Sequence, residues 1–212
     1  MRPLSIEVFG DFTSPWCWIA ERRLHQALDE AGALQQAQLH YRPFLQNPSI
    51  QPQGIERRYY CTAKAGSWAR AQLLDAQVSA AGQEQGLEFR FDRISTVPQT
   101  LAAHLLVWQT QQSAPAKTSA LVDAIYHGYF HLGLDIGKHQ VLADIAASVG
   151  LDAKACLNAL NKAQGLSELR VLLAESRKPS IDKVPLVDID GHRVTGAQPI
   201  SVFRRAITRS PL

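Results

Sequence analysis

Alternation of apolar and polar positions divides this chain into strand-forming ends and a long helical middle. The apolar run Leu4–Phe9 predicts a first strand, and Pro15–Ala31 has the spacing of a helix. Alternating residues over Gln38–Phe44 predict a second strand, after which helical periodicity dominates from Gly54 to Lys178. The first part of the chain is therefore expected to form a βαβ unit, followed by a bundle of helices.

Two points within the helical stretch carry a different signal. Leu87–Phe91 alternates over a few residues, so we expect a short extended piece there. The segment Thr96-Val97-Pro98 punctuates the periodicity and is expected to start the next helix.

The pattern changes again near the carboxyl end. Asp190-Gly191, between alternating apolar residues, is a strong signal for a β-hairpin, and a helix is expected over Pro199–Thr208. Pro185 opens the first hairpin strand, where proline is tolerated only at an end or an edge. The predicted order of elements is thus βαβ, helices, ββα.

Composition and charge narrow the class of protein. The chain has 212 residues, 46% of them hydrophobic, which argues against disorder and allows a sizeable core. A net charge of +3 is too small to imply nucleic acid or a membrane surface. No run approaches the ~18 apolar residues of a membrane span, and Met1–Glu7 lacks the apolar core of a signal peptide. We expect a cytoplasmic protein with no membrane or nucleic-acid partner.

A compact motif, Ser14-Pro15-Trp16-Cys17, lies between the first predicted strand and the first predicted helix. Serine is a favoured N-cap and proline a favoured first helical residue, so the Ser14 hydroxyl is expected to accept from the Cys17 N–H. Of the two tryptophans, Trp16 is expected to be exposed and Trp18 to pack inward. Any Ser-Pro helix start has this pattern. The functional alternative is that the positive helix end stabilises an anion, such as the thiolate of a bound cosubstrate.

Together these motifs resemble the DsbA-like branch of the thioredoxin superfamily. The nearest group is FrnE-like, and its relatives are the kappa-class glutathione transferases and the 2-hydroxychromene-2-carboxylate isomerases. The segments that carry the resemblance are Asp11–Trp18, Tyr41–Phe44 with Asn47-Pro48, Pro98–Thr100 with Ala103-His104, Ala124–Ile136, Val184-Pro185 and Gly196–Pro199. The resemblance implies an α/β, thioredoxin-like fold (βαβ–ββα) with a large α-helical insertion. It would form a single domain over 1–212, with the thioredoxin-fold part at 1–50 and 180–212 and the insertion at 54–178.

The resemblance also implies a set of site residues. Pro185 would be a cis-proline facing the active-site helix, with the backbone of Val184 offered to an extended thiol peptide; an ordinary edge-strand proline is the alternative. His104 lies in an apolar helix, as a packed histidine or as a residue beside the active-site helix. The implied catalytic residues are Ser14 and Cys17, and the implied thiol-binding residues are Pro15, Trp16, Val184, Pro185, Gln198 and His104.

Departures from the family pattern bear on the chemistry. Ser14 replaces the first cysteine of a Cys-x-x-Cys motif, and a serine hydroxyl can neither attack a disulfide nor be expelled from one. The glutathione-using relatives carry serine at both ends of the motif, whereas this chain keeps Cys17. They also carry a Ser-Asp or Asn-Asp pair where this chain has Ala197 and Gln198.

The function implied is that of an oxidoreductase-class enzyme acting on thiols, which handles glutathione or another thiol cosubstrate without cycling an internal disulfide. One alternative is a glutathione-dependent isomerase or transferase, and another is a non-catalytic module that binds thiol peptides. Its partner would be a small-molecule thiol or a thiol-containing peptide. No tightly bound cofactor is expected, and a homodimer is left open.

The remaining cysteines and histidines receive a structural interpretation first. Three cysteines give no even disulfide framework, so all are expected to be free thiols. Cys156 fits an apolar helix face, whereas Cys61 follows Arg57-Arg58, whose charges would lower its pKa unless it is simply a half-buried helix cysteine. No cysteine–histidine spacing suggests zinc, so we expect no metal site.

Overall fold

The computed structural model describes residues 3–176 and 181–209, and the chain forms two compact units. Unit 1 comprises Met1–Gln46 and Arg170–Leu212, and unit 2 comprises Asn47–Leu169. Unit 1 is therefore assembled from both ends of the chain. Within the described residues no helix is long and apolar enough to span a membrane.

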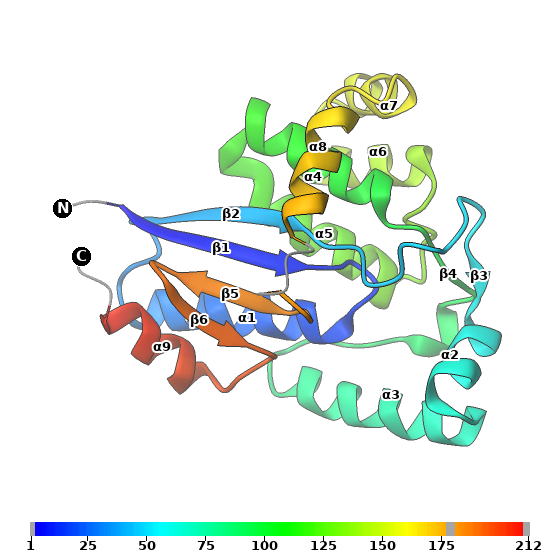
Figure 1. Ribbon diagram of the computed structural model, residues 1–212, viewed down its shortest axis with the longest axis horizontal. Coiled ribbons are helices and arrows are strands. Elements are labelled where there is room, and N and C mark those ends of the chain that lie inside the picture. Colours follow the sequence, from blue (N-terminus) through cyan, green and yellow to red (C-terminus); the bar gives the residue numbers. More distant parts are fainter. Residues whose placement is uncertain (1–2, 177–180, 210–212) are drawn as a thin grey trace. The chain divides into compact units, whose positions relative to one another are not determined.

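Unit 1 is built on a four-stranded sheet in the order β2-β1-β5-β6 (Figure 1). Its strands are β1 (Leu4–Gly10), β2 (Ala37–Pro43), β5 (Leu186–Ile189) and β6 (His192–Thr195). β1 pairs in parallel with β2 and antiparallel with β5, and β5 pairs antiparallel with β6. The strands predicted at both ends of the chain are confirmed, and they join in one thioredoxin-like sheet.

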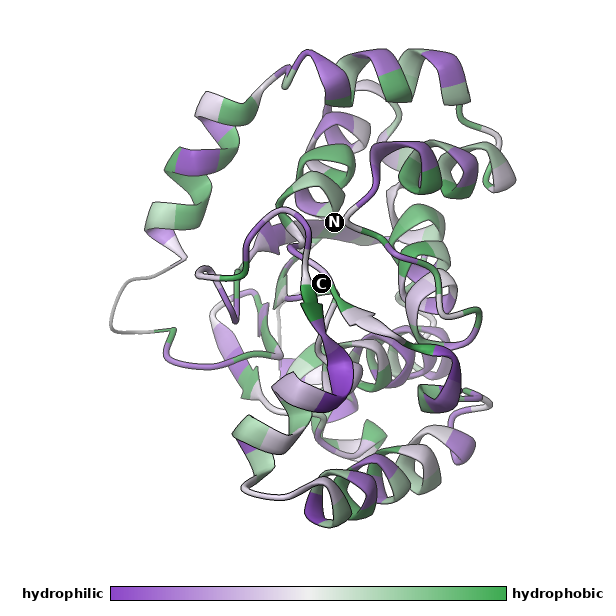
Figure 2. Cartoon of the chain, turned by 90° about the vertical axis from the view of Figure 1, so that its right-hand side faces the viewer, coloured by the Kyte–Doolittle hydropathy of each residue, from purple (hydrophilic) through white to green (hydrophobic). Residues whose placement is uncertain are grey.

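Two helices, α1 (Pro15–Glu30) and α9 (Ile200–Arg209), pack in one core with the sheet of unit 1. Leu4 and Ile6 of β1 are buried in this core with Phe203 of α9. Phe9 belongs to a second cluster with Leu186, as expected because successive strand residues point to opposite faces. Helices with one buried and one exposed face carry both colours in Figure 2, which is coloured by hydropathy.

The predicted hairpin turn between β5 and β6 is confirmed. Asp190 and Gly191 have φ of 48° and 88°, the left-handed values that both central residues of a type I′ turn require. The Gly191 N–H donates to the Asp188 Oδ1 at 2.7 Å, which holds the turn closed.

Unit 2 is mainly helical and contains one small two-stranded ladder. Its elements are β3 (Ile55–Glu56), α2 (Arg57–Ala65), α3 (Trp68–Gln83), β4 (Thr96–Val97), α4 (Leu101–Ser113), α5 (Thr118–Phe130), α6 (His139–Ser148), α7 (Ala153–Asn161) and the start of α8 (Leu166–Glu175). Two short 3₁₀ turns, Phe91–Arg93 and Pro115–Lys117, connect them. The helical periodicity of this stretch is thus confirmed.

One local prediction within unit 2 is wrong. Thr96 and Val97 do not start a helix; they pair with Glu56 and Ile55, and α4 begins only at Leu101. A proline disfavours helical conformation in the residue before it, so Pro98 keeps Val97 extended.

The short piece at Leu87–Phe91 lies outside the α-helices: residues 87–90 are neither helix nor strand, and Phe91 begins a 3₁₀ turn. The Phe89 ring stacks on Phe91 at 5.4 Å between centroids and meets the Phe130 ring edge-on at 5.3 Å. The Arg90 N–H donates to the Phe130 carbonyl oxygen at 2.8 Å. The apolar alternation therefore reflects packing of a loop against α5, not pairing with another strand.

Candidate functional site

The Ser-Pro-Trp-Cys motif lies at the carboxyl end of β1 and opens α1. At that end of the sheet Gly10 pairs with Pro43, and Phe9 pairs with Leu186. Because β5 runs antiparallel to β1, the residue directly before β5, Pro185, lies at the same end of the sheet as the motif. The topology therefore brings the Ser14–Cys17 motif and Val184-Pro185, from opposite ends of the chain, to one end of the sheet.

Asp11 organises the turn that leads into the motif, a role that the sequence reasoning missed. Its buried carboxylate accepts from the Thr13 N–H at 3.0 Å and from the Thr13 hydroxyl at 3.1 Å. It also accepts from the Gln46 N–H at 2.6 Å, which links the end of unit 1's first segment to the turn. The Asp-x-Thr spacing is typical of a turn closed by the aspartate side chain and was the available signal.

Ser14 occupies the N-cap of α1 in extended conformation (φ −98°, ψ 109°), and Pro15 is the first helical residue, as predicted. The predicted capping bond is wrong: the Ser14 hydroxyl caps no backbone N–H, and the Cys17 N–H donates to the Ser14 carbonyl oxygen at 3.1 Å. The hydroxyl is hydrogen-bonded to the Cys17 side chain instead. The buried sulfur three residues along the helix thus competes with the backbone for this hydroxyl.

Cys17 is buried, with 4% of its surface exposed. Burial raises the pKa of its thiol to about 12, although the hydrogen bond from Ser14 acts in the opposite direction. The negative charges of Asp11 and Glu21 raise the pKa further. Desolvation therefore outweighs the stabilisation of a thiolate at the helix end, and Cys17 is a protonated thiol at neutral pH.

The two tryptophans of the motif separate as predicted. Trp16 is 40% exposed, whereas Trp18 is fully buried. Pro15 has no N–H and the Cys17 N–H is already used, so Trp16 carries the remaining donor of the first helical turn. Among the described residues its N–H has no backbone acceptor. The helix end therefore presents an aromatic side chain and one N–H that can bind a ligand.

The Val184–Pro185 peptide bond is cis, as the resemblance implied. The Pro185 carbonyl oxygen accepts from the Gly196 N–H at 2.8 Å, which continues the pairing of the hairpin beyond β5. In the part of the chain that the structure describes, neither backbone group of Val184 pairs with another residue. These groups can therefore pair with an added extended chain.

The loop that follows β6 is tied to α1. The Arg23 Nη1 donates to the Ala197 carbonyl oxygen at 2.7 Å. The exposed Gln198 side chain donates from Nε2 to the Thr195 carbonyl oxygen at 2.9 Å, which leaves its Oε1 as the free end of the amide. Sequence reasoning did not identify Arg23, because no local pattern indicates a bond between residues so far apart in the chain.

His104 belongs to α4 of unit 2 and is buried there. Its backbone N–H donates to the Thr100 carbonyl oxygen at 3.0 Å in the first turn of the helix. This bond belongs to the helix and does not test the role of His104 at the thiol site, which stays a prediction.

The other two cysteines are free thiols, as expected, and Cys61 is the half-buried helix cysteine that was one of its two alternatives. Burial raises the pKa of Cys61, and the charge of Arg57 only partly opposes this effect. The carboxylate of Asp75, which pairs with Arg57 at 2.8 Å, also raises the pKa of Cys61. Cys156 is only half-buried and lines a cavity rather than the core. The described residues contain no group of three or more potential metal ligands.

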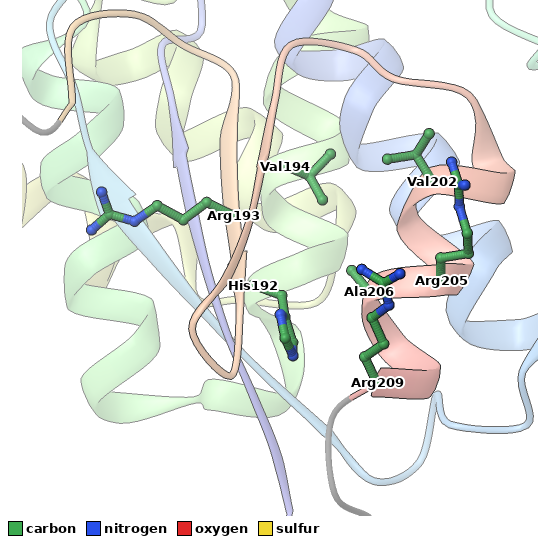
Figure 3. Close-up of a pocket in the computed structure, with 7 residues that line it drawn as sticks. All are labelled: His192, Arg193, Val194, Val202, Arg205, Ala206 and Arg209. Carbon is green, nitrogen blue, oxygen red and sulfur yellow. The ribbon is translucent and has the colours of Figure 1, made fainter.

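A hollow of about 330 Å³ lies in unit 1 between β6 and α9 (Figure 3). His192, Arg205 and Arg209 contribute basic side chains, whereas Arg193 points away and donates to Asp188 at 3.2 Å. His192 pairs with Ile189, so this hollow lies at the opposite end of the hairpin from Pro185. A cation in the last turn of a helix, such as Arg209, interacts favourably with the helix dipole. Because it lies at the turn end of the β5–β6 hairpin, the hollow is separate from the thiol motif.

Comparison with known proteins places this geometry in a family. A family model described as a DSBA-like thioredoxin domain matches residues 5–208. A probable DsbA oxidoreductase from Streptomyces coelicolor is 27% identical, with a TM-score of 0.87 over 99% of this chain and 92% of that one.

Two more distant structures share the fold. A 2-hydroxychromene-2-carboxylate isomerase is 14% identical, with a TM-score of 0.72 over 97% of this chain and 95% of that one. The cytosolic disulfide reductase DsbM from Pseudomonas aeruginosa, with GSH, is 18% identical, with a TM-score of 0.67 over 97% and 98%. The family match covers nearly the whole chain and agrees with the sheet, the helix start and the proline described above: this protein belongs to the DSBA-like thioredoxin domain family.

Proposed function

We propose that this protein is an enzyme that binds a thiol cosubstrate, such as glutathione, at the amino end of α1 and does not cycle an internal disulfide. The observation that carries the proposal is the Ser14–Cys17 pair. Ser14 stands at the first motif position and is hydrogen-bonded to a thiol whose pKa burial raises to about 12.

The motif itself excludes the usual dithiol cycle. An internal disulfide needs two sulfurs, and the motif holds one. Cys17 is protonated at neutral pH and buried, so it is also a poor nucleophile on its own. A sulfur that reacts at this site must therefore come from a bound molecule.

Hydrogen-bond donors are available to hold that sulfur as a thiolate. A protonated Cys17 can donate its S–H to the Ser14 oxygen, which frees the Ser14 O–H to donate to an incoming sulfur. The Trp16 N–H adds a second donor at the positive end of the helix. Each unit by which these donors lower the pKa of the bound thiol corresponds to about 1.4 kcal/mol.

The segment before β5 suits the peptide part of such a ligand. Val184 offers an N–H and a carbonyl oxygen that pair with no other described residue. It lies at the end of the sheet where the motif also lies. An extended peptide that carries a thiol would pair with these two groups as a short added strand. The Gln198 Oε1 provides an acceptor for the ammonium group of such a ligand, although without the charge of an acidic residue.

Glutathione is the thiol that the comparisons favour. The DsbM structure carries GSH on the same fold, and the kappa transferases and isomerases that this chain resembles use it. The absence of an acidic residue at positions 197 and 198 leads us to expect weaker glutathione binding than in those relatives.

A glutathione-dependent isomerase is the second candidate, supported by one observation. Serine at the first motif position, with no reactive thiol behind it, serves a reaction in which glutathione is used without net oxidation. Turnover of a thiol-disulfide substrate distinguishes the oxidoreductase from the isomerase, and absence of any turnover despite thiol binding would indicate a binding module.

Titration with glutathione tests the proposal. Glutathione should bind, and the ultraviolet absorbance of its thiolate should appear at lower pH than in free solution. Ser14→Ala should weaken binding by about 10-fold or more, the value of a lost hydrogen bond to a charged group. Ser5→Ala, an exposed serine of β1, is the matched control and should bind as the unaltered protein does. Equal affinity for glutathione and S-methylglutathione, or no effect of Ser14→Ala, would contradict the proposal.

A further inference from the structure

Unit 2 contains a cavity that the thiol site does not involve. It has a volume of about 510 Å³, which falls within the range of small-molecule sites. Its walls come from α4, α7, the loop after α7 and the start of α8. The small side chains Ala155 and Ala159 of α7 leave this space open opposite larger residues of α4, among them Trp108.

The backbone holds Trp108 firmly against one wall of the cavity. A Cβ atom at Gly165 would lie 1.9 Å from the Trp108 Cζ3, so only glycine permits this approach. Gly165 has φ of 78°, and Ala163 two residues earlier has φ of 49°, a left-handed value that costs about 1–2 kcal/mol for an L-residue. The loop thus adopts an unfavourable backbone conformation, in which Gly165 lies against the indole ring of Trp108.

A buried acceptor lies beside this ring. The Gln109 Nε2 donates to the Gln164 carbonyl oxygen at 2.8 Å, which determines the orientation of the amide. Its Oε1 is buried and accepts no hydrogen bond from any residue that the structure describes. This oxygen is closed to solvent, so the amide acts through its Nε2 bond, which ties α4 to the loop before α8, and its oxygen is not reached from the cavity.

The rim of the cavity carries one negative charge. Glu168 lines the opening, and hydrogen bonds from its own backbone N–H and from Ser167 lower the pKa of its carboxyl. It is therefore ionised at neutral pH and attracts a cation. The remaining polar side chains of the lining, Gln112 and Ser113 among them, are uncharged.

From these features we infer that the cavity binds a small aromatic amine in its protonated form. Trp108 lines the cavity and can contact the aromatic body or the cation, and Glu168 balances the charge. An aromatic acid of the same size would meet the Glu168 carboxylate unfavourably. The site is independent of the proposed thiol chemistry, because every residue in the argument belongs to unit 2.

Binding of three matched probes tests the inference on the full-length protein. They are 2-phenylethylamine, 2-phenylethanol and phenylacetate, measured by calorimetry. The amine should bind at least ten times more tightly than phenylacetate, with the alcohol between them. It should also slow alkylation of Cys156, which lines the cavity, while alkylation of Cys61 serves as the internal reference.

Variants locate the binding site. Ala159→Phe should fill the cavity and abolish binding of the amine, and the smaller change Ala155→Leu, at another lining residue of α7, provides a second test if phenylalanine disturbs folding. Glu168→Gln should weaken binding of the amine about fivefold or more, whereas Glu175→Gln, an exposed carboxylate later in α8, should change nothing. The inference is overturned if the amine does not bind, if phenylacetate binds equally well, or if neither Ala159→Phe nor Ala155→Leu reduces binding.

Discussion

The side chain of Ser14 does not make the helix-capping bond expected of an N-cap serine, because it is hydrogen-bonded to the Cys17 side chain. The hydroxyl that would ordinarily cap the helix is hydrogen-bonded to the thiol, and the backbone carbonyl of Ser14 takes the Cys17 N–H. Burial makes the thiol a weak acid. At this scale the chemistry depends on desolvation more than on the helix dipole.

Alkylation of Cys17 should therefore be slow in the folded protein. With a pKa of about 12 and little exposure, Cys17 should react with iodoacetamide roughly tenfold or more slowly than the half-buried Cys61 at pH 8. Its rate should still rise about tenfold per pH unit from pH 8 to 10, because the thiolate fraction is far from saturation. Mass spectrometry of the alkylated peptides measures both rates. Faster labelling of Cys17 than of Cys61 would indicate a reactive lone thiol.

Dithiol activity should be absent from the unaltered protein and created by one substitution. The protein should reduce insulin negligibly with dithiothreitol, since the motif holds one sulfur. Ser14→Cys places a second sulfur beside Cys17, where the Ser14 hydroxyl already contacts the thiol, and should form a disulfide under oxidant. The disulfide is counted by mass, and insulin precipitation measures the activity. Robust activity of the unaltered protein that is lost in Cys17→Ala would refute this prediction.

At the scale of elements, strands and helices were predictable where a periodicity extends over several residues. The alternation in β1 and the Asp190-Gly191 turn predict unit 1 correctly, because each is a local signal. The pair β3–β4 was missed, since two residues are too few to show a period. The bonds of Asp11 to Gln46 and of Arg23 to Ala197 join distant parts of the chain, and one sequence cannot indicate which distant residues meet.

The β5–β6 turn offers a clean test of a local signal. Gly191 has φ of 88° and nothing within 4 Å of the position a Cβ would take, so Gly191→Ala introduces backbone strain without a clash. We expect the free energy of unfolding to fall by about 1 kcal/mol, measured by urea denaturation. Gly191→Asn should cost less, because asparagine tolerates the left-handed region. A loss as large for asparagine as for alanine would argue against the turn geometry.

At the scale of the whole molecule, the chain divides its residues between two units with different continuity. Unit 2 is one uninterrupted segment, Asn47–Leu169, with its own buried aromatic cluster around Phe130. Unit 1 needs segments from both ends of the chain. The two units should therefore differ in whether they can fold when isolated.

A fragment spanning residues 47–169 should fold by itself. Its core includes Leu121, Ile125 and Leu142, which are fully buried and lie inside the segment. We expect helical circular dichroism and a cooperative thermal transition below that of the full chain. A fragment spanning residues 1–46 lacks β5, β6 and α9 and should remain unfolded. A fragment 47–169 without a cooperative transition would contradict the prediction.

The placement of β1 in the interior of its sheet has a consequence for synthesis on the ribosome. β1 and β2 are both translated early, but β5, which pairs with the other side of β1, follows the whole of unit 2. At about 5–20 residues per second, that delay is on the order of ten seconds. During it the backbone groups of β1 that pair with β5 are unpaired, so we expect nascent molecules to be prone to association with other chains until the last strands are translated.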